Sequence, residues 1–350
     1  MSQQICKVQV IRGEPGLSDR WSTLPQQLDQ GNLAQLPQWF NAIRLAYGHT
    51  PIYLEAEDAR GQGGILPSFV IRSHLFGTVL TSMPFLDTGG PCSTSRALSH
   101  TLVASLIEEA GRVGASRVEL RCTAALDLPV PVLNDKVSLV LPLTADPDCL
   151  WRRLNPKVRN QVRKAERSGL SIEFGGAEKL DDFYAIFAAN MRDLGSPVHA
   201  RGFFRATFSS FGHDARVVLV RKGAVAVGGL IALAFKNILV VPWASSLRQY
   251  FSLCPNNLLY WETLRSACKE GFGRFDFGRS SRNSGTYHFK RQWGALEEPL
   301  FWYTLPLGHA RHLSLSSTDP QAAILVRLWQ RLPVRLTRWI GPCIRKYLTQ

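Results

Sequence analysis

The sequence predicts a fold of the α/β (α+β) class, in which two copies of one unit follow each other along the chain. Each copy should be a mixed, mostly antiparallel sheet flanked by helices. Three observations favour this fold. The chain has 350 residues, which is too long for one ordinary hydrophobic core. Two groups of short strands recur about half a chain apart, and an amphipathic helical pattern follows each group.

The two groups of strands occupy residues 52–85 and 216–246. In each group, short apolar segments are separated by polar turns, "DARGQ" and "SHLFG" in the first, "RKG" and "KN" in the second. Turns of this kind between short apolar strands are typical of β-hairpins. Each group therefore predicts an antiparallel meander of three strands.

A helix and a further strand follow each meander. Residues 97–114 and 256–273 carry apolar side chains at helical spacing and end at a glycine, where helices usually stop. Strand-like segments come next, at residues 116–121 and 274–279. The same elements in the same order indicate a duplicated unit rather than a chance likeness of two hairpins. Helical patterns also precede the two meanders, at residues 35–48 and 180–195.

The predicted domains are residues 1–135, residues 136–306 and a tail of residues 307–350. A proline-rich stretch, residues 126–147, joins the first two domains. Its apolar part, "KVSLVLPL", predicts a strand that opens the second domain.

The tail predicts basic amphipathic helices. One face carries apolar side chains, another carries arginines, and residues 322–350 contain no acidic residue. The apolar residues are Leu325, Leu328, Trp329 and Leu332, and the arginines are Arg327, Arg331, Arg335 and Arg338. This pattern suits a helix on the anionic inner face of the cytoplasmic membrane. A helix docked on the protein's own surface has the same pattern, and the sequence leaves both open.

The composition indicates a soluble protein with an anionic partner. The formal net charge of +14 suits nucleic acid, nucleotide phosphates or an anionic membrane face, although excess arginine also serves solubility. The seven cysteines are scattered and form no CxxC pair, which disfavours a disulfide framework and a metal site. The longest apolar run, residues 223–235, is too short to span a bilayer, and residues 1–13 lack the features of a signal peptide. We therefore expect a cytoplasmic protein without a bound metal.

Two polar stretches predict the functional site. The first, "RFDFGRSSRNSGTYHFKRQWG" at residues 274–294, begins as a strand and continues as a polar loop. The corresponding stretch of the first copy, "CTAALDLPVPV", is chemically quiet, so the second copy is expected to hold the active site. The second stretch is a basic helix at residues 150–170, where Arg159 and Arg163 are one turn apart and could grip a phosphate. A solvated basic helix face is the simpler alternative.

Four stretches in this order resemble the FemAB-type transferases: "PSFVIRSHLFGTVLTSMPFLDTGGP", "NPKVRNQVRKAERSGL", "MRDLGSPVH" and "FDFGRSSRNSGTYHFKRQWG". They are more similar still to the FemAB-related proteins encoded with PEP-CTERM protein-sorting and exopolysaccharide loci. The resemblance covers about residues 35–306. It implies two GNAT-like (acyl-CoA N-acyltransferase-like) domains in tandem, and a transfer of an aminoacyl group from charged tRNA to an amine of a peptidoglycan precursor.

The resemblance also implies roles for named residues. Lys290 of "FKRQWG" corresponds to a lysine at the anionic end of the family's substrate site, which makes it a catalytic candidate. The family's basic helix, which would hold substrate phosphate, falls on Lys157, Arg159, Arg163 and Lys164. In the 274–294 stretch we expect Arg279 and Ser280 to bind substrate. Tyr287, Asp276 and His288 are candidates for the general base, and the sequence does not choose among them.

Two departures from the family leave the donor open. The long coiled-coil arm of the Gram-positive enzymes has no counterpart, and the stretch "SLRQYFSLCPNNLLYW" lacks the usual GNAT pyrophosphate loop. We therefore expect no permanently bound cofactor and either acyl-CoA or aminoacyl-tRNA as donor. The expected function is transfer of an acyl or aminoacyl group onto an amine of a phosphate-bearing cell-envelope or exopolysaccharide precursor.

Other functions and partners remain open at this stage. The alternatives are a non-catalytic scaffold that binds nucleotide or RNA phosphates, and an acyl-CoA-dependent N-acetyltransferase. The expected partners are a nucleotide- or lipid-linked saccharide precursor, charged tRNA, and the anionic inner membrane contacted through the tail.

Overall fold

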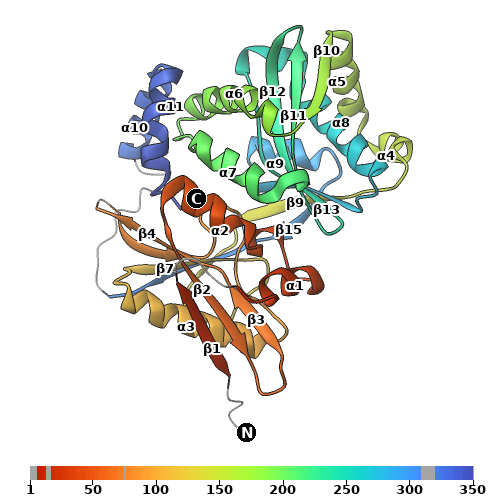
Figure 1. The fold of residues 1–350 in the computed structure, drawn as a ribbon. Helices are drawn as coiled ribbons and strands as arrows, with labels where there is room; N and C mark the ends of the chain where they lie inside the picture. The colour runs from red at the N-terminus through yellow and green to blue at the C-terminus, as the bar shows by residue number, and fades with distance from the viewer. Residues whose placement is uncertain (1–5, 13–16, 75, 309–319, 350) are drawn as a thin grey trace. The chain divides into compact units, whose positions relative to one another are not determined.

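The computed structural model describes residues 6–12, 17–74, 76–308 and 320–349, with side chains from residue 323 onward in the last segment. The chain divides into two compact units. The first comprises the described parts of Met1–Lys136, Pro299–Ser314 and Tyr347–Gln350. The second comprises the described parts of Val137–Glu298 and Leu315–Lys346. Figure 1 shows both units as ribbons.

The first unit is built on one mixed sheet. Its described strands lie in the order β6-β3-β2-β4-β5-β7-β16-β8, and β1 pairs with β2. The strands are β1 (Lys7–Arg12), β2 (Thr50–Glu57), β3 (Gly63–Leu66), β4 (Phe69–Ser73), β5 (Gly77–Thr81), β6 (Cys92–Ser93), β7 (Arg117–Cys122), β8 (Val132–Leu133) and β16 (Phe301–Pro306). The helices are α1 (Arg20–Gln27), α2 (Gln38–Tyr47) and α3 (Arg96–Arg112).

Helix α3 forms because its start is capped and one of its faces is apolar. The side chain of Ser95 accepts a hydrogen bond from the backbone N–H of Leu98, which satisfies one of the free donors of the first turn. Leu98, Leu102 and Leu106 recur at helical spacing and are buried against the sheet. The predicted helix at residues 97–114 is thus present, two residues shorter at its end.

The second unit repeats this plan. Its strands lie in the order β10-β11-β12-β13-β14-β9-β15. They are β9 (Lys136–Pro142), β10 (Leu170–Gly175), β11 (Ala215–Lys222), β12 (Val225–Phe235), β13 (Ile238–Ser246), β14 (Arg274–Ser281) and β15 (Leu296–Pro299). The helices are α4 (Pro147–Arg153), α5 (Pro156–Arg167), α6 (Leu180–Asp193), α7 (Arg201–Phe211), α8 (Pro255–Lys269) and α9 (Gly285–Arg291).

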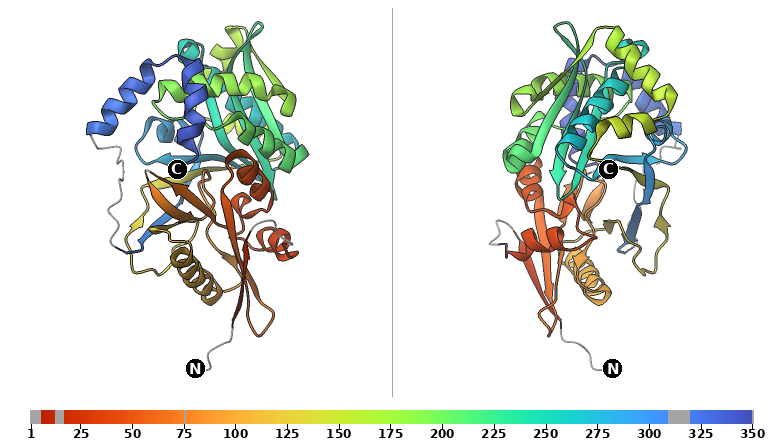
Figure 2. Two further views of the ribbon diagram at one scale, coloured as in Figure 1. Left: turned by 60° about the vertical axis from the view of Figure 1, so that its left-hand side comes forward. Right: turned by 90° about the vertical axis from the view of Figure 1, so that its right-hand side faces the viewer.

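Helices cover both faces of the second sheet. Val218 and Val220 of β11 face the core that contains α5 and α8, whereas the intervening Leu219 lies beside Phe183 of α6. Alternate residues of a strand point to opposite faces, so α6 lies on the face away from α8. Figures 1 and 2 show α6 and α7 on one side of this sheet and α5 and α8 on the other.

The order of elements confirms the predicted duplication. The first unit has β2, β3 with β4, β5, α3 and β7 in this order, with the short strand β6 inserted before α3. The second unit has β11, β12, β13, α8 and β14 in the same order, with a 3-10 helix inserted before α8. The middle strand differs between the copies. It is continuous in β12 but interrupted in the first unit, where Pro67 and Ser68 separate β3 from β4. A proline cannot donate to the strand ladder, which accounts for the interruption.

Strand β16 belongs to the first unit, although the sequence placed residues up to 306 in the second predicted domain. It pairs antiparallel with β7, where Trp302 lies opposite Arg121 and Tyr303 opposite Leu120. Tyr303 and Leu305 contribute to the core of the first unit. The first sheet therefore includes a strand that follows the second sheet in the chain.

The tail contains two basic helices, α10 (Pro320–Arg331) and α11 (Val334–Arg345). Both pack on the second unit through contacts with α6 and its C-terminal end. Residues 309–319 of the predicted tail lie outside the described residues. In the described part of the chain, no helix is both long enough and apolar enough to cross a bilayer.

Candidate functional site

Strands β13 and β14 of the second unit pair only at their beginnings. They are parallel, and their register joins Ile238 to Arg274, Leu239 to Phe275 and Val240 to Asp276. β13 continues to Ser246 and β14 to Ser281 without further pairing between them in this register. The facing main-chain groups beyond Val240 are therefore not used in a ladder between these two strands, and an extended ligand could pair with them.

Gly278 lies just past the end of this ladder and turns the backbone of β14. Its φ of +75° is in the left-handed region, where any side chain would add strain. Its N–H donates a hydrogen bond of 2.7 Å to Oδ1 of Asp276, which also accepts one of 2.5 Å from the hydroxyl of Ser138 in β9. The turn therefore holds a carboxylate at the place where the two strands stop pairing.

Lys290 of α9 reaches the same turn. Its side chain is buried, and Nζ donates hydrogen bonds of 2.8 Å to the carbonyl of Gly278 and 2.9 Å to that of Arg279. The ammonium predicted to face anionic groups thus faces two main-chain carbonyls. The structure brings Lys290, Asp276 and Arg279 together around one glycine, and a positive charge lies beside the part of β14 that follows its ladder with β13.

The polar loop predicted after residue 278 is in fact a longer strand followed by a short helix. β14 extends to Ser281, and the side chain of Ser284 caps α9 by accepting a hydrogen bond of 3.2 Å from the N–H of Tyr287. The helix can form because a serine caps its start and no proline follows within it. It directs the side chain of Lys290 back toward β14.

The structure separates the three candidate general bases. The Tyr287 hydroxyl donates to the carboxylate of Glu297, and this hydrogen bond raises the pKa of Tyr287 above its usual value near 10. The phenol is therefore protonated at neutral pH and cannot act as a base there. His288 is exposed on α9. Asp276 is the candidate that lies at Gly278.

Ser280 supplies a hydroxyl that the fold does not use. It is 4% exposed, and its Oγ has no hydrogen-bond partner among the described residues. An unpaired buried hydroxyl costs stability, so such groups are rare unless a ligand satisfies them. Ser280 lies in the part of β14 that does not pair with β13.

The basic helix is α5, and its four predicted phosphate ligands lie on two sides. Lys157 and Lys164 are four residues before and three after Gln161, so all three share one side. Arg159 and Arg163 share the other, where the Arg163 guanidinium lies 5.7 Å from the Trp151 ring centroid. The Nε of Arg159 is buried without a hydrogen-bond partner in the described structure. The four residues therefore do not form one cluster.

Two hydrogen bonds connect the end of β13 to α5. The hydroxyl of Ser246 donates 2.5 Å to Oδ1 of Asn256, and the amide of Asn257 donates 3.1 Å to Oε1 of Gln161. Both asparagines lie in the first turn of α8. The side of α5 that carries Lys157 and Lys164 is thus the one that faces the start of α8. The sequence did not predict that Ser138, Asn256 and Gln161 belong to the candidate site. Each is an isolated polar residue without a recognisable motif, and only the fold brings it to the site.

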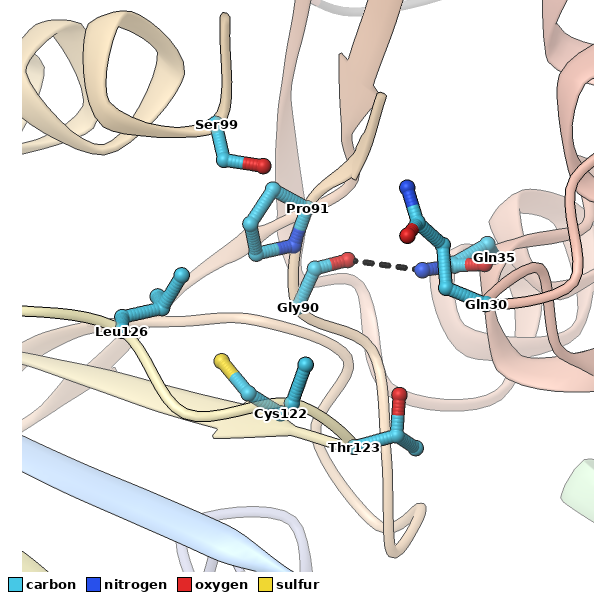
Figure 3. A pocket seen from close by; sticks show the side chains of 9 residues that line it. Gln30, Gln35, Gly90, Pro91, Ser99, Cys122, Thr123 and Leu126 are labelled. Atoms are coloured by element: carbon cyan, nitrogen blue, oxygen red, sulfur yellow. Dashed lines mark hydrogen bonds between the residues drawn. The ribbon is translucent and has the colours of Figure 1, made fainter. Parts of the chain in front are cut away.

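In the first unit, the edge of β7 beyond its ladder with β5 corresponds to the edge of β14 beyond its ladder with β13, and the chain itself covers it. The ladder between β5 and β7 ends at Thr81 and Glu119, and the N–H of Gly90 then donates 2.8 Å to the carbonyl of Arg121 in β7. Figure 3 shows Gly90 beside Cys122, with its carbonyl accepting a hydrogen bond of 2.9 Å from Gln35. The main chain of residue 90 therefore occupies the edge of β7 that a ligand would need.

A small cavity lies next to Gly90 in the first unit. Its volume is about 50 Å³, and Gln30, Pro91, Ser99 and Leu126 are among its lining residues (Figure 3). This is space for a few water molecules. Burial raises the pKa of the Cys122 thiol at its wall to about 12, so the thiol is protonated and not nucleophilic at neutral pH. We assign no substrate to this cavity.

Among the described residues, no three His, Cys, Asp or Glu side chains are placed so that they could hold a metal ion.

The comparisons with known proteins agree with this architecture. The family model of an acetyltransferase (GNAT) domain matches residues 152–291. No curated protein sequence is similar enough to the chain to count as a match. The solved structure of FemX has 13% identity and a TM-score of 0.63, and the match covers 84% of this chain and 97% of that chain.

Two further solved structures are similar over most of the chain. A tandem GNAT protein from the clavulanic acid biosynthesis pathway has 11% identity and a TM-score of 0.55, covering 87% of this chain and 100% of that chain. The C-terminal domain of a putative lysylphosphatidylglycerol synthetase from Agrobacterium fabrum has 11% identity and a TM-score of 0.54, covering 88% and 94%. At these identities the likeness shows the fold alone. The fold is the GNAT fold in a tandem arrangement, which confirms the predicted class.

Proposed function

We propose that the second unit transfers an acyl or aminoacyl group onto an amine of a phosphate-bearing cell-envelope or exopolysaccharide precursor. The observation that carries this proposal is the interrupted pairing of β13 and β14 inside a GNAT domain, the domain of acyl transfer. Asp276, Ser280 and Lys290 lie at that interruption. In the first unit, the bond from Gly90 to Arg121 closes the equivalent place, which supports a single active site.

The chemistry requires a neutral amine and a stabilised oxyanion. The amine nitrogen attacks the carbonyl carbon of a thioester or ester donor, and the carbonyl electron pair moves to oxygen. The bond to the leaving sulfur or oxygen then breaks, and the leaving group takes up a proton. Positive charge and N–H groups near the developing oxyanion lower this barrier. Lys290 supplies the charge, and main-chain N–H groups of β13 beyond Val240 supply hydrogen-bond donors.

Asp276 is the group we propose as the proton acceptor. Its carboxylate is held by Ser138 and by the N–H of Gly278, at the end of the ladder. A carboxylate there can take the proton that the attacking nitrogen loses. Tyr287 donates to Glu297, which leaves it as a hydrogen-bond donor rather than a base. In this proposal the hydroxyl of Ser280 and the guanidinium of Arg279 bind the acceptor.

Lys157 and Lys164, on the side of α5 that carries Gln161, would hold the phosphate of the acceptor. Arg159 and Arg163 add two positive charges on the other side of the same helix, and Gln161 connects the helix to the start of α8. Phosphate oxygens bind well to such side chains. A nucleotide- or lipid-linked saccharide precursor carries both the phosphate and an amino sugar, and we propose the reaction takes place in the cytoplasm.

Two donors are compatible with the proposal. The GNAT domain match favours acyl-CoA in general. The segment before α8 folds as a 3-10 helix, Arg248–Leu253, without the glycines of a pyrophosphate loop, and this departure favours aminoacyl-tRNA. The name of the putative lysylphosphatidylglycerol synthetase among the similar structures refers to an aminoacyl product. One assay with both donors decides between them.

The test uses the full chain with radiolabelled acetyl-CoA or charged tRNA, and a panel of nucleotide-linked amino sugars. We expect label to enter the acceptor with one donor class. Asp276→Asn should lower the rate at neutral pH, and Asp214→Asn, at an exposed ion pair with His213, serves as the matched control. A donor that raises the thermal midpoint identifies binding independently of turnover.

A scaffold without catalysis is the competing function. It would bind RNA with a steep dependence on salt and give no label transfer with any donor or acceptor in the panel. That outcome, together with equal binding by wild type and Asp276→Asn, would overturn the proposed reaction.

A further inference from the structure

The helix pair α10–α11 packs on the second unit and leaves several large apolar side chains exposed. In α10, Val326 lies against Gly195, and Gln330 donates a hydrogen bond of 3.0 Å to the carbonyl of Asp193. Leu328 is two residues from Val326 and two from Gln330. At 3.6 residues per turn, its side chain therefore points to the opposite side of the helix, about 200° away. It is 55% exposed, and Leu325 is 57% exposed.

Helix α11 repeats this orientation. Thr337 is buried, and Gly341 lies close to Val198. Trp339 is two residues from both of these, so it points to the opposite side, where it is 77% exposed. Leu336 is exposed on the same outer side. In both helices, Thr337, Gly341, Val326 and Gln330 contact the protein, Trp329, Leu332, Ile340 and Ile344 are half-buried, and Leu325, Leu328, Leu336 and Trp339 are exposed.

The sequence left open whether the tail docks on the protein's own surface or on a membrane, and both helices do pack on the second unit. The apolar face that the sequence predicted is divided: Trp329 and Leu332 are half-buried, whereas Leu325 and Leu328 are exposed. We call Ile324, Leu325, Leu328, Leu336 and Trp339, which are exposed large apolar side chains of the two helices, the C-terminal helix face. Leu194, which adjoins Gly195 beneath α10, is also 61% exposed. Large apolar side chains gathered on one surface mark an interaction site.

The charge of the same helices indicates what covers this face. Residues 320–346 contain six basic residues and no acidic residue. Arg338 and Arg345 are used within the second unit, over the ring of Tyr184 and at His199. Arg327, Arg331 and Arg335 have no acidic partner in the described part of the chain. The occupant must therefore be both apolar and anionic.

We propose that the C-terminal helix face binds the surface of a bilayer that contains anionic phospholipid. Leucines and a tryptophan would enter the interfacial region while the arginines contact lipid phosphates, as in an interfacial amphipathic helix. No described helix could span that bilayer, so the contact is peripheral. The proposal is independent of the transfer reaction, because none of its residues lies at Gly278 or on α5.

The test is flotation of the full chain with vesicles of phosphatidylcholine alone or of phosphatidylcholine mixed with phosphatidylglycerol. We expect the wild type to float with the mixed vesicles, less with phosphatidylcholine alone, and less again at high salt. Arg331→Gln with Arg335→Gln should weaken binding by about fivefold for each charge removed. Leu328→Ser with Trp339→Ser should weaken it by tenfold or more.

Matched control variants test whether any loss of vesicle binding is specific to the C-terminal helix face. Leu45→Ser with Leu133→Ser removes two other exposed leucines, and Arg60→Gln with Arg205→Gln removes two other exposed charges. Both pairs should float as the wild type does. All substituted residues of the helix face are exposed, so the variants should keep the thermal midpoint of the wild type.

Three outcomes would overturn the proposal. The first is that the variant with Leu328→Ser and Trp339→Ser floats as well as the wild type. The second is that the wild type binds both kinds of vesicle equally. The third is that the wild type does not float and instead forms a dimer that the same variant abolishes. The last result would show that a second copy of the chain covers the face.

Discussion

The Nε of Arg345 in α11 donates a hydrogen bond of 3.0 Å to Nε2 of His199, next to the start of α7. The histidine is buried, with its ring stacked at 4.9 Å on that of Phe203. The acceptor nitrogen must be unprotonated, so the histidine that anchors the last helix is neutral. Burial, and then the nearby charge of Arg345, hold the pKa of His199 well below its ordinary value near 6.5.

This contact predicts a loss of stability in acid. His199 binds a proton more readily in the unfolded chain than in the folded protein, so its contribution is complete above about pH 6.5 and falls as the pH decreases below that value. We expect urea unfolding to give a lower free energy at pH 5 than at pH 7. His199→Gln, which can still accept from Arg345, should show a smaller difference between these pH values. An equal difference in both proteins would assign the pH dependence to other groups.

Ser280 predicts opposite changes in stability and activity. Removal of an unsatisfied buried hydroxyl should raise the free energy of unfolding, by about 1 kcal/mol. The proposed acceptor loses a hydrogen bond, so Ser280→Ala should lower transfer by about tenfold. Ser245 is equally buried, but its Oγ accepts a bond of 3.0 Å from Asn190. Ser245→Ala should therefore be destabilising, and if both serine variants lose stability, Ser280 is an ordinary structural residue.

The backbone conformation of Gly278 predicts that substitution of this glycine impairs both stability and activity. Alanine at a φ of +75° costs about 1–2 kcal/mol and would move the carbonyl that Lys290 binds. We expect Gly278→Ala to lower both the thermal midpoint and the rate of transfer. Gly202→Ala in α7 is the control, because an added Cβ there meets nothing within 4 Å. If Gly278→Ala retains the wild-type midpoint and rate, the turn has no special role.

The two sides of α5 can be compared at equal charge. Lys157→Gln with Lys164→Gln removes two charges from the side that carries Gln161, and Arg159→Gln with Arg163→Gln removes two from the other side. We expect the lysine pair to weaken binding of a phosphate-bearing acceptor by about tenfold more than the arginine pair, as measured by calorimetry. The reverse order would move the phosphate to the Trp151 side, and equal small effects would make α5 a solvated helix.

The elements of the fold were predictable where local pattern and tertiary packing agree. Leu98, Leu102 and Leu106 recur at helical spacing and are buried together, and α8 follows the same logic. β16 was misplaced because its partner β7 is far away in the sequence, and strand pairing at long range leaves no local signal. The helix α9 was missed because seven residues carry too little periodicity to distinguish a helix from a loop.

The sequence indicated candidate site residues but not the contacts that they make. The sequence identified Lys290 as a positive charge, yet the charge meets the carbonyls of Gly278 and Arg279. Only the left-handed turn at Gly278 brings these groups within reach, and a φ angle is not visible in a sequence. The orientation of α10 was likewise hidden, because the sequence gives an apolar side and a basic side but not which of them meets the protein.

Strand β16 also imposes an order on the making of the protein. A ribosome completes every strand of the second sheet, from Lys136 to Pro299, before it reaches the last strand of the first. Until Pro306 is synthesised, the edge of β7 that β16 will cover is open, and an open edge strand invites pairing with other chains. The sheet of the first unit therefore stays incomplete until β16 is made, whereas the sheet of the second unit can already form. A fragment that ends near residue 136 should aggregate for the same reason.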